Sequence, residues 1–278
     1  MLTKHLPGKH NQKTHGRGGA ARATYGATYH EAIAGGATHA EARQRARVAG
    51  RTAVGGGGDP HAVSPETVTA PTAPAAIPEG HEFASGREAD KALIAASSLK
   101  ADDLDYATQS ALQHYQHNGY KDINGGLRTG DKAKLRENKS EIEKIDNVLS
   151  QSRTTQPLTT HRAMVVKPGS PAAAMLEQMV PGAEFREMGY MSTTVDKRRL
   201  SGFVKSIGGA KGAQQVNMRV HVPTGSKAAY MNAIAKPRGL QDYREERELL
   251  IARGSRFRVV SRSVNASGGI DMDVELMP

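Results

Sequence analysis

The sequence predicts an α+β fold in which helices come first and strands follow. Residues 88–152 carry apolar residues at helical spacing, whereas residues 158–278 contain several short runs with strand-like alternation. Helices collected ahead of strands are typical of α+β proteins and not of alternating βαβ units. The connections between the last strands are short enough for hairpins, which favours antiparallel pairing.

A long N-terminal stretch differs in composition from the rest of the chain. Residues 1–84 are rich in Gly, Ala, Thr, His and Pro, and they include GGGG at 55–58 and PTAPAAIP at 71–78. Such segments are linker signals and offer no regular apolar face. The hydrophobic content of the whole chain is 37%, below the level typical of a fully folded protein. We therefore predict a disordered, low-complexity, basic tail or linker over 1–84 and a folded domain over 85–278.

Helices are expected throughout the first part of the folded domain. They cover 92–99, 102–117, 120–128 and 135–152. Asp102 or Asp103 favours the beginning of the second helix, and Gly119 is expected to end it. The third helix contains a glycine break, and the fourth is amphipathic with its charges on the outer face.

Strands dominate the second part. They are expected at 158–166, 189–195, 215–223, 228–232, 248–252, 255–264 and 269–277, with helices at 170–179 and 200–207. Pro157 and Pro168 bound the first strand, because proline donates no hydrogen bond to a sheet. Hydroxyl residues end the strand at 189–195.

Charge and composition limit the classes of partner. The formal charge is +10 and the pI about 9.8, which favours anionic partners or simply solubility. Four Phe, eight Tyr and no Trp argue against a base-stacking platform, so nucleic acid is not the expected partner. No segment approaches the ~20 apolar residues of a membrane span, and the basic N-terminus lacks the apolar core of a secretion signal. We therefore expect neither membrane association nor a secretion signal.

The chain contains no cysteine, which excludes disulfides, thiolate metal sites and a cysteine nucleophile. His5, His10 and His15 recur every five residues, but they lie in a carboxylate-free stretch without partners to hold a ligand geometry. No metal is expected.

An acidic segment, REERELLIARGSRF at 244–257, stands out from the strands around it. It places Glu245, Glu246 and Glu248 at the mouth of an apolar run. In a strand, Glu246 and Glu248 would share one face and Arg247 would take the other. Two adjacent carboxylates repel each other, so this pair indicates either a functional site or a charged, solvent-facing strand edge that discourages aggregation.

Three motifs in order carry a resemblance to a known family. They are Arg162 on the first strand, Ser192-Thr193-Thr194 at a strand end, and Glu246 with Glu248 on a later strand. This set resembles the Arg–Ser–Glu class of mono-ADP-ribosyltransferases, the clostridial exoenzyme and binary-toxin type, over roughly residues 88–278. Further matching positions are Tyr115, Tyr120, Asn124, Leu127-Arg128, Val222-Pro223-Thr224-Gly225, Leu249-Leu250-Ile251 and Gly254-Ser255.

The resemblance implies roles for the matched residues. Glu248 would hold the positive charge that develops on ribose as the nicotinamide bond of NAD breaks. Glu246 would orient and deprotonate the acceptor, and glutamate here, where other members have glutamine, implies an arginine acceptor. Arg162 would grip the phosphate and ribose of NAD, and Ser192 would hold Glu248. The other residues that the resemblance places at NAD are Tyr115, Tyr120, Asn124, Ala163 and Phe203.

Each of these residues also has a purely structural interpretation. Arg162 fits a surface cation on an edge strand, Ser192 a strand-end hydroxyl, and the tyrosines core positions. The sequence also departs from the family pattern, with Ala163 where glycine is frequent and Thr194 in place of a serine. Lys205 and Ser206 stand near, but out of register with, an expected basic residue.

The fold implied by the resemblance is a helical layer on two packed antiparallel sheets that form a cleft for NAD. The implied activity is mono-ADP-ribosyl transfer from NAD to an arginine of a target protein, with host proteins among the candidates. The loop at 232–244 recognises the target in this family. An NAD glycohydrolase remains an alternative.

A second resemblance concerns the N-terminus. KHLPGKHNQKTHG at 4–16 resembles a segment that recurs in bacteriophage head and portal-associated proteins. It implies a phage or prophage origin, with the virion or the host cytoplasm as location and phage head proteins as partners. A head-associated structural protein with an inactive ADP-ribosyltransferase fold is therefore the other alternative.

Overall fold

The structure is a computed structural model that describes residues 80–201, 212–237 and 242–278, all within the unit Gly58–Pro278. The predicted tail therefore lies almost wholly outside the described residues. Its last residues, 80–84, are an exception because they reach the first strand. The backbone N–H of His81 donates to Pro157 O at 2.9 Å, and that of Thr159 donates to His81 O at 3.1 Å.

Helices form the first part of the described chain, as predicted. They are α3 (Gly86–Ala96), η2 (Ala101–Asp103), α4 (Tyr106–His114), η3 (Tyr115–Gly119), α5 (Tyr120–Thr129), α6 (Lys132–Glu137) and α7 (Lys139–Gln151). Ser85 caps α3 by accepting from Glu88 N at 3.2 Å. Asp105 caps α4 by accepting from Thr108 N at 2.7 Å. The capping aspartate is thus Asp105, a short side chain directly ahead of the first turn, and neither Asp102 nor Asp103.

Two of the expected helix breaks are wrong. Gly119 does not end α4, because it belongs to η3, a π-helical turn that runs directly into α5. Gly125 and Gly126 lie inside α5 without interrupting it. A Cβ on Gly126 would lie 3.0 Å from Lys134 Cβ, so this glycine allows α6 to approach α5 closely. An unpredicted break lies further along the chain, at Asn138, where the predicted helix 135–152 is divided into α6 and α7.

The second part of the chain contributes the strands and a few short helices. The strands are β1 (Leu158–Val166), β2 (Glu184–Glu187), β3 (Met191–Thr194), β4 (Gln214–Val222), β5 (Ala228–Tyr230), β6 (Glu248–Ile251), β7 (Ser255–Val264) and β8 (Ile270–Leu276). The helices are α8 (Pro171–Gln178), η4 (Lys197–Arg199), α10 (Met231–Ile234) and η5 (Arg244–Glu246). β2 was not predicted, and the predicted helix 200–207 falls almost wholly outside the described residues.

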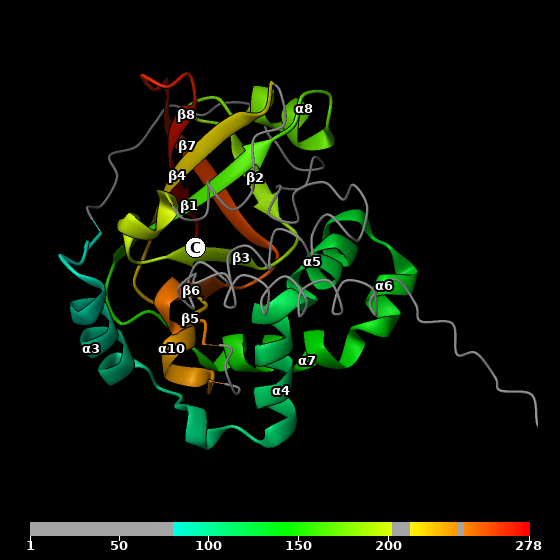
Figure 1. The fold of residues 1–278 in the computed structure, drawn as a ribbon, viewed down its shortest axis with the longest axis vertical. Helices are drawn as coiled ribbons and strands as arrows, with labels where there is room; N and C mark the ends of the chain where they lie inside the picture. Colours follow the sequence, from blue (N-terminus) through cyan, green and yellow to red (C-terminus); the bar gives the residue numbers. More distant parts are fainter. Residues whose placement is uncertain (1–79, 202–211, 238–241) are drawn as a thin grey trace, which may run out of the picture. The chain divides into compact units, whose positions relative to one another are not determined.

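The α+β class is confirmed, whereas the arrangement of the strands differs from the expected pair of antiparallel sheets. The described strands form one eight-stranded sheet in the order β2-β7-β8-β4-β1-β3-β6-β5. β4 and β8 pair in parallel, and the other pairs are antiparallel. β1 joins β3 through a single register pair, His161 with Thr194. The sheet thus has two parts, and β3 runs across the direction of β1 and β4 (Figure 1).

β1 lies at the junction of these two parts and is buried along its whole length. Helices α4 to α7 gather beside β3, β6 and β5, and α8 lies near β2 (Figure 1). From α7, Ile142, Ile145, Val148 and Leu149 enter the core. A side chain on β1 therefore has a rigid, fully packed support.

Candidate functional site

Arg162 projects from the middle of β1 into the interior. Its side chain is buried, with 3% of the residue exposed, and its Nη1 donates to Ser192 O on β3 at 2.9 Å. This contact ties the arginine to the strand that carries the Ser-Thr-Thr motif. Burial rules out the alternative of a surface cation.

Glu248 is the first residue of β6 and is also buried, with 4% exposed. Its backbone pairs with Thr194 on β3. Gln116 donates from Nε2 to Glu248 Oε2 at 3.2 Å, and the Ser192 hydroxyl is hydrogen-bonded to the same carboxylate. The structure therefore brings together Arg162, Ser192 and Glu248, as the order of the motifs predicted.

The surroundings of Glu248 shift its protonation towards neutral pH. Burial, followed by the negative charge of Glu246, raises the pKa of Glu248 from 4.5 to about 7. The hydrogen bonds from Ser192 and Gln116 and the charge of Arg162 act in the opposite direction. A carboxylate whose pKa is shifted to near neutral pH by such opposing influences is typical of functional sites.

Glu246 reaches this site in a way that the sequence did not predict. It does not lie on the strand with Glu248, because it ends the 3-10 turn η5. Arg247 follows in a left-handed conformation, with φ 46° and ψ 49°, and the strand begins only at Glu248. The expected strand alternation is therefore wrong, although the charge of Glu246 still acts on Glu248. A turn, and not a shared strand face, thus brings the carboxylate of Glu246 close enough to act electrostatically on that of Glu248.

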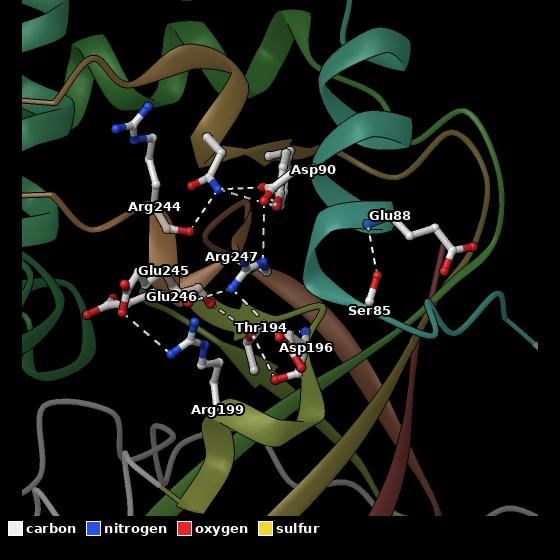
Figure 2. A network of polar contacts seen from close by, with 12 residues as sticks. Ser85, Glu88, Asp90, Thr194, Asp196, Arg199, Arg244, Glu245, Glu246 and Arg247 are labelled. Atoms are coloured by element: carbon white, nitrogen blue, oxygen red, sulfur yellow. Dashed lines mark hydrogen bonds and ion pairs between the residues drawn. The ribbon is translucent and has the colours of Figure 1, made fainter. Parts of the chain in front are cut away.

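Glu245 lies at the outer side of the turn. Its side chain is 69% exposed, and its Oε2 lies 3.5 Å from Arg199 Nη1. Figure 2 shows this pair beside Glu246. An exposed pair of this kind contributes little, which agrees with the assignment of Glu246 and Glu248, and not Glu245, to the acidic pair.

The aromatic residues of the predicted site lie on η3 and α5. Tyr115 is buried, and its ring meets Tyr120 and Tyr190 edge-to-face at centroid distances of 6.4 Å and 5.6 Å. Asn124 is completely buried, donates to the Tyr115 hydroxyl at 3.1 Å and accepts from Tyr190 N at 2.8 Å. These contacts hold the chain just ahead of Ser192, so the described contacts of Asn124 are structural.

The remaining predicted residues are placed only in part. Ala163 follows Arg162 on β1 and is buried, paired in register with Asn217 of β4. Phe203 lies outside the described residues, and so do Lys205 and Ser206. The predicted roles of Ala163 and Phe203 at NAD stay predictions.

Sequence reasoning missed the contribution of the π-helical turn. η3 contains Gln116, which reaches Glu248, and His117, whose Nδ1 is hydrogen-bonded to the Tyr243 hydroxyl ahead of the acidic turn. π-helical turns are rare and frequently lie at functional sites. The signal available in the sequence is the position of Gln116 directly after Tyr115, inside a matched motif. The spacing of the apolar residues around it predicts an ordinary α-helix, which would not single out Gln116.

Neither a metal site nor a membrane helix is found in the described part of the chain. Among residues 80–201, 212–237 and 242–278, no three His, Asp or Glu residues are grouped so that they could hold a metal ion. Within the same ranges, no helix has the length and apolar character needed to cross a membrane.

The site can be compared with known proteins. The ADP-ribosyltransferase exoenzyme family matches residues 96–273. A protein of Mycobacterium avium (strain 104) is 27% identical over 173 residues, and its name describes a candidate NAD(+)–arginine ADP-ribosyltransferase, Mav. The match covers 62% of this chain but only 17% of that relative.

Solved structures share the fold at low sequence identity. An ADP-ribosyltransferase from Clostridium botulinum, solved in a triclinic form, superposes with a TM-score of 0.54 and 19% identity, covering 72% of this chain and 100% of the other. The Vis ADP-ribosyltransferase of Vibrio splendidus, solved with agmatine, gives 0.53 and 17%, covering 69% and 83%. The match over residues 96–273 spans the elements that carry Arg162, Ser192 and Glu248, and this chain therefore belongs to the ADP-ribosyltransferase exoenzyme family, for which NAD is the donor substrate.

Proposed function

We propose that this chain transfers ADP-ribose from NAD to an arginine side chain of a target protein and releases nicotinamide. The observation that carries the proposal is the buried carboxylate of Glu248, on which the charges of Arg162 and Glu246 both act. The family supplies the class of reaction, and these three residues supply the chemistry on this chain.

Glu248 would stabilise the transition state. Breaking the bond between nicotinamide and ribose leaves positive charge on the sugar, as in glycoside hydrolysis, and a preorganised carboxylate beside it lowers the barrier. With a pKa of about 7, Glu248 carries this negative charge at neutral to alkaline pH. Ser192 and Gln116 fix the carboxylate through hydrogen bonds.

Arg162 would bind the donor. A guanidinium presents a planar set of donors that suits phosphate oxygens, and Arg162 offers such a group beside the carboxylate that acts on the ribose. Tyr115, Tyr120, Asn124, Ala163 and Phe203 stay candidates for the rest of the NAD site.

Glu246 would act on the acceptor. A guanidinium is normally charged, so it needs a carboxylate partner to become nucleophilic. Glu246 is half-buried and lies on η5, two residues before Glu248. This place suits a carboxylate that pairs with an acceptor guanidinium. The name of the Mav relative and the agmatine bound to Vis, a guanidinium compound, support arginine as the acceptor.

The test compares wild type, Glu248→Ala and Glu246→Gln with labelled NAD and either agmatine or host lysate. Glu248→Ala is expected to lower nicotinamide release and transfer together, by at least about 100-fold. Glu246→Gln is expected to lower transfer by a similar factor and to leave hydrolysis of NAD within about twofold. Arg219→Ala is the control, because Arg219 is half-exposed on β4 and pairs with Asp273.

The outcome also separates the alternatives. Wild-type protein that releases nicotinamide but labels neither agmatine nor protein is an NAD glycohydrolase. Wild-type protein that does neither, and shows no thermal shift with NAD, supports the inactive head-associated alternative.

The N-terminal part carries a separate proposal. We infer that residues 1–84 form a tail to a catalytic domain at 85–278, and that the segment 4–16 reflects a phage or prophage origin. Its support is the composition and the short resemblance alone. Mass spectrometry of purified particles and of host cytoplasm from an induced lysogen would locate the protein, and its absence from particles would remove the virion assignment.

A further inference from the structure

Arg247, between the two acidic residues, has a backbone conformation that residues with a side chain rarely adopt. No other non-glycine residue among those described has a positive φ. A left-handed backbone is unfavourable for a residue with a Cβ, so the surroundings must hold it. The same conformation sets the direction in which the chain leaves η5 and enters β6. It therefore sets Glu246 relative to Glu248.

The guanidinium of Arg247 is held between two aspartates. Its Nε lies 3.4 Å from Asp90 Oδ2 on α3, and its Nη1 lies 3.7 Å from Asp196 Oδ2, just after β3. The Arg247 side chain is 17% exposed and that of Asp196 only 5%. Figure 2 shows Arg247 between these partners, with Glu245 and Glu246 on the adjoining turn. Ion pairs this far from solvent are screened less than surface pairs.

A glycine of α3 makes room for this side chain. A Cβ on Gly86 would lie 1.9 Å from Arg247 Nε and 2.3 Å from its Cζ. The guanidinium therefore rests directly on the backbone at the first residue of the helix, where any larger residue would displace it.

Asp90 also holds the other end of the acidic turn. Its Oδ1 accepts from the Tyr230 hydroxyl and from Asn232 Nδ2, both at 2.7 Å. Asn232 Nδ2 also donates to the carbonyl of Arg244 at 2.8 Å. One aspartate on α3 thus connects the beginning of η5, at Arg244 through Asn232, with Arg247, the residue directly after η5.

The position of Glu248 is held by other contacts, although the charge of Glu246 acts on its pKa. Its backbone is paired with Thr194 in the sheet, and its carboxylate is bonded by Ser192 and Gln116. Glu246 belongs to the turn itself, where its carbonyl accepts from Thr194 Oγ1 at 2.8 Å. Loosening the turn would therefore move Glu246 more than Glu248.

We propose that Arg247 is a positioning residue for Glu246, and that Asp90 and Gly86 of α3 hold the Arg247 side chain in place. The inference rests on the proposed transfer to arginine, because it concerns the acceptor side of that site. α3 (Gly86–Ala96) lies almost entirely ahead of the family match, which begins at residue 96. The structure thus assigns a part in the proposed transferase site to a helix that lies almost entirely outside residues 96–273, the part of the chain that the family matches.

The first experiment uses the full chain carrying Arg247→Ala or Arg247→Lys. Nicotinamide release without acceptor and ADP-ribosyl-agmatine formation are measured under the same conditions, together with the KM for NAD. Arg247→Ala is expected to lower transfer about tenfold while hydrolysis and the KM for NAD stay within about twofold. Arg247→Lys is expected to restore part of the loss, since lysine keeps the charge but cannot reach both aspartates with a planar fork.

The second experiment approaches the same contact from the helix. Gly86→Ala adds one methyl group, and alanine favours helix over glycine, so the melting temperature should not fall through helix propensity. The displaced guanidinium is expected to produce the same selective loss of transfer. In the Arg247→Ala background, Gly86→Ala should add nothing further, because its effect passes through Arg247. Arg219→Ala again serves as the control for losing an arginine–aspartate pair elsewhere.

Three results would overturn the inference. One is an unchanged ratio of transfer to hydrolysis in folded Arg247→Ala, and another is a parallel fall of both activities. If Arg247→Ala does not fold, Gly86→Ala decides, and an unchanged ratio there is the third. A wild-type protein that hydrolyses NAD without labelling agmatine or protein arginine refutes the proposed function itself, and the inference falls with it.

Discussion

At the scale of single residues, the proposed chemistry depends on a balance of influences on the pKa of one carboxylate, that of Glu248. Burial and Glu246 raise the pKa of Glu248, and Ser192, Gln116 and Arg162 restrain the rise. The sequence identified four of these five residues because residue type and order are enough to recognise them. Gln116 escaped because no pattern in one chain shows that a helix widens by a residue at one turn.

Replacing Gln116 by alanine tests this balance. The amide stabilises the ionised form of Glu248, so its loss should raise the pKa of that carboxyl further above the wild-type value of about 7. Activity that requires the carboxylate would then disappear at a higher pH as the solution is acidified. The acid limb of kcat/KM for nicotinamide release is the measurement, since it reports the free enzyme.

Gln113→Ala is the matched control for this change. Gln113 lies one turn earlier, on α4, and its Nε2 donates to Lys236 O at 2.9 Å. Its removal therefore leaves the hydrogen bond from Gln116 to Glu248 in place. Its acid limb should coincide with that of wild type. A Gln116→Ala profile that also coincides would show that the amide does not influence the carboxylate.

At the scale of elements, local signals located the segments better than their ends or their partners. β1 agrees with the predicted 158–166 because proline bounds it on both sides. β2 has only four residues, and because Glu184, Arg186 and Glu187 are charged it offers a single apolar position and no strand-like alternation. The two-residue spacing of Glu246 and Glu248 predicted a strand. The same spacing occurs here in a 3-10 turn that ends at Glu246 and is followed by one left-handed residue, Arg247.

A buried ion pair fastens α5 to β2. Arg128 donates from Nε and Nη2 to the two carboxylate oxygens of Glu187 at 2.8 Å and 3.1 Å, and the Glu187 side chain is 0% exposed. Arg128→Met would leave that carboxylate buried without its charged partner, which costs about 3–5 kcal/mol. We expect this loss in the free energy of unfolding measured with urea.

Lys139→Met is the control for the buried pair. Lys139 and Glu143 are 73% and 64% exposed at a distance of 3.7 Å, so removing this pair should change stability by less than about 1 kcal/mol. Adding Glu187→Gln to Arg128→Met should recover part of the loss, because the buried charge is then gone. Equal effects of Arg128→Met and Lys139→Met would refute the assignment.

At the scale of the whole molecule, composition and element order were sufficient for the α+β class but not for the connection of the strands. The parallel pairing of β4 with β8 joins residues some 50 positions apart, such as Val216 with Ile270, and no local pattern records such a contact. The helical layer followed from periodicity, which is a local property.

The boundary of the folded part can be tested by truncation. Residues 80–84 bond to β1, so a chain beginning at Gly80 should unfold at the same temperature as the full chain. A chain beginning at Ser85 loses the two backbone hydrogen bonds of His81. It should be less stable by roughly 1–3 kcal/mol. Thermal denaturation of the three proteins decides the boundary, and identical midpoints for both truncations would support the predicted division at 84/85.

The place of β8 in the sheet has a consequence during synthesis. Ile270–Leu276 lies between β7 and β4 and is the strand that joins β2-β7 to β4-β1. A nascent chain therefore carries all of Arg162, Ser192 and Glu248 before β2 and β7 can join the strands that hold these residues. Until residues 270–276 leave the ribosome, β4 lacks its parallel neighbour and β2 and β7 cannot join β4 and β1, so the eight-stranded sheet can close only after those residues have been released.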